Sequence, residues 1–141
     1  MKSVSYAMDA LLSPTEELMD QLRAQLNAAI DQFASAVSTL VDLPSPDSAE
    51  EACATCRRAV QMFVLAYGDL MTVDTVKTQI LVESLERAEL GLKDAAAAQD
   101  ETSPIWHYVD NVRRRKELVD ALLEGDLPRY KEILREGLEV A

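Results

Sequence analysis

Residues 13–41, SPTEELMDQLRAQLNAAIDQFASAVSTLV, decide the fold. Apolar residues recur in this stretch at steps of three or four: Leu18, Leu22, Leu26, Ile30, Phe33, Val37 and Leu40. This spacing matches one face of an α-helix, and a rise of about 1.5 Å per residue makes that helix about 42 Å long. Leu43-Pro44-Ser45-Pro46 follows, where residues before proline avoid the helical region. The sequence predicts a long first helix over residues 13–41.

Serine marks the start of three predicted helices. Ser13 and Ser48 each precede a glutamate by three residues, which is the pattern of a capping box between the serine and glutamate side chains and the helix amides. Ser13 and Ser103 are each followed by proline, which suits the first turn because its missing N–H has no partner there. These marks predict helices over residues 13–41, 48–68, 72–98, 103–124 and 127–139. The third of them begins at Thr72 or at Asp74.

The predicted helices suit one bundle. Each carries an apolar face, and no long run alternates with the period of a β-strand. Connections of about two to eight residues favour an antiparallel up-and-down arrangement of four main helices plus a short C-terminal one after Gly125. A chain of 141 residues with 48% apolar residues suits a single all-α domain. Gly91, inside the third predicted helix, indicates close packing or a bend.

The net charge of −11 is concentrated in the first 51 residues, which hold nine acidic and two basic side chains. This balance disfavours direct contact with nucleic-acid phosphates, and it suits either solubility or a basic protein partner. No stretch reaches the roughly 18 apolar residues of a membrane span, and the N-terminus lacks the pattern of a leader. Together with only two cysteines, this predicts a cytoplasmic protein.

Residues 1–12 form a candidate arm before the first predicted helix. Val4, Tyr6, Met8 and Leu11 make the segment too apolar for a solvated tail. It either packs on its own chain or docks on a partner. Tyr6, Met8 and Leu11 are therefore candidate partner-binding residues.

Cys53-Ala54-Thr55-Cys56 is the one candidate for chemistry. Two thiols at this spacing near a helix start can cycle between dithiol and disulfide. Redox proteins of the alkylhydroperoxidase D type carry such a pair followed by a histidine one turn on, but Val60 stands at that place here. The alternative interpretation is that Cys56 is a core residue and Cys53 a partly buried one.

The sequence does not contain the residue patterns of a metal or cofactor site. Two cysteines and one histidine spread over 55 residues do not make a zinc site, and no Glu-x-x-His pair indicates a di-iron bundle. Four glycines leave no phosphate-binding loop. We predict no cofactor, no metal and no catalytic residues, with Cys53 and Cys56 as the alternative.

Two groups in the fourth predicted helix are candidate binding residues. Trp106, His107 and Tyr108 form an aromatic cluster in its first turn, which either packs inward or anchors a partner. Arg113, Arg114, Arg115 and Lys116 form a basic block in mid-helix. Four consecutive helical residues sweep about 300° around the axis, so at least one must pair with a neighbouring helix or lie along an apolar seam.

These patterns predict a non-enzymatic protein interaction module, such as a small acidic adaptor, chaperone or regulatory subunit. Its partner is another protein with a basic surface or a second copy in a homodimer, because the first predicted helix exceeds what a minimal four-helix core needs. The alternatives are a thiol redox enzyme and an acidic inhibitor that mimics nucleic acid.

Overall fold

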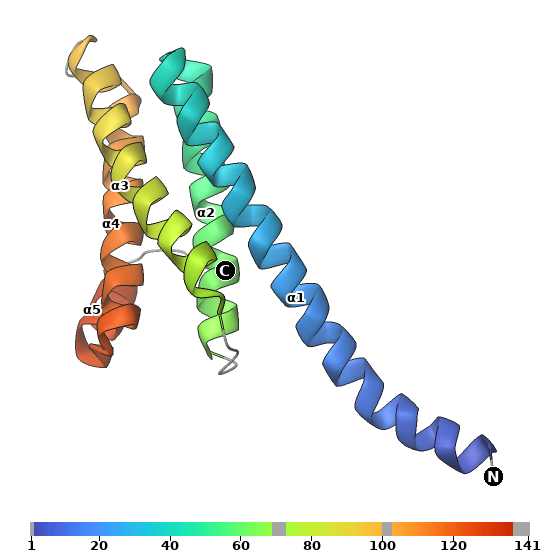
Figure 1. The fold of residues 1–141 in the computed structure, drawn as a ribbon. Coiled ribbons are helices and arrows are strands. Elements are labelled where there is room, and N and C mark those ends of the chain that lie inside the picture. Colours follow the sequence, from blue (N-terminus) through green and yellow to red (C-terminus); the bar gives the residue numbers. More distant parts are fainter. Residues whose placement is uncertain (1, 69–72, 100–102, 137–141) are drawn as a thin grey trace.

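The computed structural model describes the backbone of residues 2–68, 73–99 and 103–136, with side chains from Glu16 onward in those ranges. These residues form five helices and no strand. Their bounds are α1 (Lys2–Asp42), α2 (Pro46–Gly68), α3 (Thr75–Ala97), α4 (Ile105–Glu124) and α5 (Leu127–Arg135) (Figure 1). The predicted all-α fold is confirmed.

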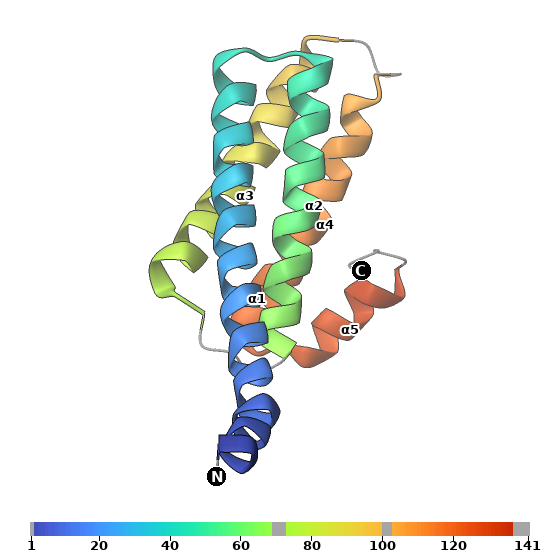
Figure 2. The same cartoon turned by 90° about the vertical axis from the view of Figure 1, so that its right-hand side faces the viewer.

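Successive helices run in opposite directions, as predicted for an up-and-down bundle (Figures 1 and 2). α1 and α2 form one antiparallel hairpin, and α3 and α4 form another. The hairpins pack side by side, so that α1 lies along α3 and α2 lies along α4. α2 and α3 follow each other in the chain but meet only across the diagonal of the bundle. α5 folds back against α4.

One continuous apolar core fills the space between the hairpins. α1 contributes the part of its apolar stripe from Leu26 to Leu40, and the rings of Phe33 and Phe63 lie fully buried near its centre. α4 adds Ile105 and Leu118. Each large apolar side chain buried in this way stabilises the fold by about 1.5–3 kcal/mol.

The predicted start of the first helix at Ser13 is wrong. α1 begins at Lys2 and continues through Ser13 and Pro14 without interruption, so residues 2–12 belong to the same helix. A proline inside a helix removes one backbone hydrogen bond and costs about 3 kcal/mol. The helix formers Ala7, Ala10 and Leu11 before it favour continuation. A cap pattern shows where a helix can begin, and it does not prevent a helix from passing through.

The predicted start of the second helix at Ser48 is two residues late, because α2 begins at Pro46. Ser45 caps α2: its Oγ accepts a hydrogen bond from the Ser48 amide at 3.0 Å, and the Ser45 amide donates to Ser48 Oγ at 2.9 Å. This is a capping box in which Ser48 takes the place usually held by glutamate. Pro46 is then the first helical residue, where its missing N–H has no cost.

The remaining helix ends lie within a few residues of their predicted positions. Of the two predicted starts of the third helix, Thr72 and Asp74, Asp74 is the one that caps α3: its side chain accepts from the Val76 amide at 2.7 Å, and the helix begins at Thr75. α4 begins at Ile105, whose amide donates to Ser103 Oγ at 3.3 Å. Gly125, with φ of 70°, ends α4. α5 extends to Arg135, and the predicted end at residue 139 lies outside the described residues.

Candidate functional site

α1 is much longer than the bundle that it helps to build. Its 41 residues span about 62 Å, whereas the 23 residues of α2 span about 35 Å. In both ribbon views its N-terminal turns project past the ends of the other helices (Figures 1 and 2). We call residues 2–22 of α1 the projecting segment.

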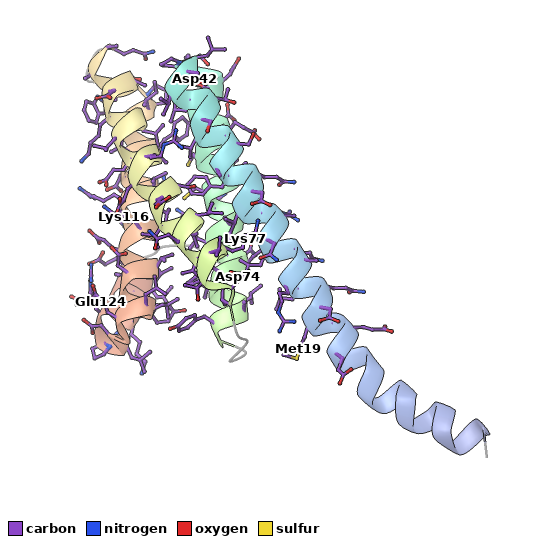
Figure 3. The ribbon with its side chains drawn as sticks, viewed as in Figure 1. Met19, Asp42, Asp74, Lys77, Lys116 and Glu124 are labelled. Atoms are coloured by element: carbon purple, nitrogen blue, oxygen red, sulfur yellow. The ribbon has the colours of Figure 1, made fainter. Side chains whose placement is uncertain are left out.

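The apolar stripe of α1 continues onto the projecting segment, where the bundle covers less and less of it. Leu26 is buried, Leu22 and Met19 are half-buried, and Leu18 is 64% exposed. Met19 lies on the side of α1 that faces the bundle (Figure 3). The helical period that builds the core therefore runs on through side chains that the bundle covers only in part and ends, among the described side chains, at the largely exposed Leu18.

Acidic side chains accompany this end of the stripe. Glu16, Glu17 and Asp20 are exposed, and Asp20 accepts from Arg23 at 3.2 Å. The next acidic residue of α1, Asp31, is about 16 Å further along the helix. Lys77 of α3, which Figure 3 labels, forms an ion pair with Asp31 at 2.7 Å. This spacing and pairing do not resemble a row of phosphates, so they lend no support to a nucleic-acid mimic.

Tyr6, Met8 and Leu11, the candidate residues of the predicted arm, lie in the projecting segment. The structure describes the backbone there, and their side chains lie outside the described residues. Trp106 and His107 are both exposed, Trp106 by 42%, in the first turn of α4. That turn lies at the opposite end of the bundle from the projecting segment (Figure 1). The two predicted contact regions are therefore separate surfaces.

The basic block spreads around α4, as the sweep of four helical residues requires. Arg113 and Arg114 both contact Asp110 one turn earlier on the outer side. Lys116 reaches across to Glu89 of α3 at 3.5 Å. Arg115 points inward and is only 3% exposed. The four residues therefore form no single basic patch.

Three predicted candidates, Cys53, Tyr108 and Arg115, come together in one pocket between α2 and α4. Its cavity measures about 270 Å³. The remaining lining residues, which sequence reasoning missed, are Glu50, Ala54, Arg57 and Asn111. The only sequence signal for them is helical spacing: residues 50, 53, 54 and 57 share one face of α2, while 108, 111 and 115 share one face of α4. We call this cavity the α2/α4 pocket.

The two thiols of the Cys-x-x-Cys pair sit in different places. Cys53 lines the pocket, and Cys56 is fully buried in the core. Burial raises the pKa of the Cys53 thiol, while the positive charges of Arg115 and Arg57 act to lower it. Burial raises the pKa of Cys56 strongly. A redox nucleophile needs a lowered pKa, so this environment lends no support to the thiol alternative.

The described side chains include no cluster of three or more His, Cys, Asp or Glu residues able to hold a metal ion. Within the described ranges, no helix is both long and apolar enough to cross a bilayer. Comparison with protein-family models, with curated proteins and with solved structures finds no match to this chain.

Proposed function

We propose that this protein is a non-enzymatic interaction module that binds a partner protein along the projecting segment of α1. The observation that carries this proposal is the continuation of the core stripe of α1 to Leu18, which is 64% exposed. Leu18 continues the half-buried Met19 and Leu22 along this end of the helix, and a contiguous apolar surface that no neighbouring helix covers marks an interaction site, whereas a single exposed leucine does not.

Helix stability supports the same conclusion. Residues 2–18 extend about 25 Å by helical rise, and most helical stability in proteins comes from packing an apolar face against a neighbour. A partner helix on this stripe would bury Leu18 and complete the burial of Leu22 and Met19. Such packing is the helix-in-groove mode of recognition, in which anchors recur at helical spacing.

Charge favours a basic partner. Glu16, Glu17 and Asp20 are exposed beside the uncovered stripe, and the whole chain carries −11. Complementary charge accelerates encounter and fixes orientation more than it adds affinity. An adaptor, chaperone or regulatory subunit would use this surface, and a second copy of the chain is the homodimeric variant.

The test places a photo-crosslinking amino acid at position 18 in the full-length chain expressed in its native cell. The matched control places it at Leu127, which is 56% exposed at the start of α5. We expect a defined adduct from position 18 and none from position 127. An adduct of twice the chain mass identifies the homodimer, and any other defined mass identifies a separate partner.

Light scattering with the variant Leu18→Asp completes the test. The substitution should abolish any self-association through the projecting segment while leaving the urea unfolding midpoint unchanged, because Leu18 lies outside the core. A monomeric wild-type protein that yields no adduct specific to position 18 would show that the proposal is wrong.

A further inference from the structure

We propose that two copies of this protein associate along α3, with their α3 helices antiparallel and Leu90 of each copy packed against Gly91 of the other. This surface lies on the bundle and does not include the projecting segment. Its basis is a groove between α3 and the C-terminal end of α1. The cavity in this groove measures about 290 Å³, and its apolar lining includes Val41, Pro44, Leu90 and Gly91. We call it the α1/α3 groove.

The centre of the α1/α3 groove is apolar and open to solvent. Leu90 of α3 is 62% exposed, and Val41 of α1 is 47% exposed. Gly91 lies beside them on α3 and carries no side chain, so the groove is hollow at this point; a Cβ atom there would lie 3.7 Å from Val41 Cγ2. The two helices run in the same direction and end at the same end of the bundle (Figure 1). A contiguous apolar surface of this kind marks a place where another apolar side chain can be buried.

Opposite charges flank this apolar centre on α3. Arg87 lies one turn before Leu90 and Asp94 lies one turn after it, so helical spacing puts the three side chains on one face. Both charged side chains are exposed, and neither forms an ion pair with another described side chain. The α1/α3 groove therefore presents a cation and an anion about 10 Å apart along the helix, with a leucine between them.

A two-fold axis midway between Leu90 and Gly91 makes this face complementary to itself. In an antiparallel pair centred there, Leu90 faces the second copy's Gly91, and Arg87 faces the second copy's Asp94. Each leucine then enters the hollow of the other copy, and two ion pairs form on either side of the apolar centre. A parallel pair would instead set Arg87 beside Arg87 and Asp94 beside Asp94. The charges therefore favour the antiparallel, two-fold symmetric arrangement.

The next positions of the same helix face agree with this pairing. Glu83 lies one turn before Arg87, and in the antiparallel pair it faces the small, exposed Ala98 of the second copy. No like charges on this face meet each other. The net charge of −11 opposes association of two copies at long range. At physiological salt, however, charges more than about 8 Å apart are largely screened, so the contacts in the groove decide the outcome.

Sedimentation equilibrium of the full chain, from micromolar to near-millimolar concentration at physiological salt, tests the proposal. We expect a monomer–dimer equilibrium. Leu90→Asp puts a charge in the apolar centre and should weaken dimerisation at least tenfold, without loss of helicity, because Leu90 is exposed in the bundle. Leu18→Asp should leave this dimer unchanged, which separates it from any contact of the projecting segment. A wild-type chain that stays monomeric would leave the groove to another protein, and it would overturn the proposal, as would a dimer that Leu90→Asp does not weaken.

Charge reversal tests the antiparallel register. Arg87→Asp alone sets two carboxylates against each other on both sides of the centre, and Asp94→Arg alone sets two arginines against each other. Each should weaken dimerisation about tenfold. The double variant restores opposite charges and should dimerise within about twofold of the wild type. Arg58→Asp changes an exposed arginine of α2 outside the groove and is the matched control, with little effect expected. A double variant as weak as the single ones would show that the register is wrong.

Mixing the two single variants tests the same contacts without a third substitution. One copy then carries acidic side chains on both sides of Leu90 and the other carries arginines there. The mixture should form a heterodimer at least tenfold more tightly than either variant forms a homodimer. A mixture of Arg58→Asp with Asp94→Arg has the same net charges and is the control, and it should show no such gain. Equal association in the two mixtures would overturn the pairing of Arg87 with Asp94.

Discussion

Gly91 of α3 packs directly against Leu40 of α1. A Cβ atom built on Gly91 would lie 3.2 Å from Leu40 Cδ2, closer than ordinary van der Waals contact. The missing side chain lets the two helices approach, which explains a glycine in mid-helix at a cost of about 1 kcal/mol in helix propensity. Of the two outcomes that the sequence left open, close packing is the one found.

We predict that Gly91→Val lowers the free energy of unfolding by about 1–3 kcal/mol, because the added atoms must displace Leu40 from a well-packed core. Urea titration followed by circular dichroism measures the change. Glu86→Val, at an exposed position of the same helix, should change stability by less than about 0.5 kcal/mol. An unchanged midpoint for Gly91→Val would mean that α1 and α3 do not approach this closely.

The cap of α2 gives a second prediction. Ser45→Ala should cost about 1 kcal/mol, because it removes the side chain that accepts from the Ser48 amide. Glu51→Ala should be nearly neutral, although the sequence pattern nominates Glu51 as the capping partner of Ser48. The urea midpoints of the two variants show which residue caps the helix. A larger loss of stability in Glu51→Ala than in Ser45→Ala would indicate that Ser48 is the capping residue and Glu51 its partner.

The core was predictable from the sequence because apolar residues at helical spacing lie on one face of a helix, and that face packs into the interior. Leu26 to Leu40 repeat at steps of three and four and are all buried. The same period continues to Leu22 and Leu18, yet these become progressively exposed. Periodicity identifies which face of a helix packs against other helices. It does not show how far along that face the neighbouring helices extend.

The α2/α4 pocket was not predictable as a unit. Cys53, Tyr108 and Arg115 were each noted, but their meeting depends on α2 lying beside α4, which connection lengths do not determine. The inward direction of Arg115 was predictable only in part. Four consecutive helical cations must include one that meets the interior or a neighbour, and packing decided that Arg115 is buried while Lys116 reaches Glu89.

Stability at alkaline pH should reveal the buried thiol of Cys56. Because burial raises its folded-state pKa, the unfolded chain loses this proton first as the pH rises past the ordinary thiol value. The folded state then binds more protons, so stability is fully present below that value and falls above it. The fall approaches about 1.4 kcal/mol per pH unit for one group.

Urea titrations at a series of pH values measure this dependence. Cys56→Ala lowers stability at every pH, but it should show a smaller fall above the ordinary thiol pKa than the wild type shows. Parallel curves for the two proteins would indicate that Cys56 ionises as easily in the folded chain as in the unfolded one.

Pro14 should limit the helicity of the projecting segment. α1 passes through this residue, where proline cannot donate to the Ala10 carbonyl and its ring crowds that turn. Pro14→Ala should therefore increase far-UV helicity and move the Cα chemical shifts of residues 7–14 toward helical values. The urea midpoint of the bundle should not move, because the buried residues of α1 begin three turns later, at Leu26. Pro128→Ala is the matched control, since Pro128 occupies the start of α5, where no amide partner is lost. Equal helicity gains in the two variants, or no gain in Pro14→Ala, would indicate that α1 begins after Pro14, as the capping pattern of Ser13 implies. The surface offered to a partner would then begin near Leu18.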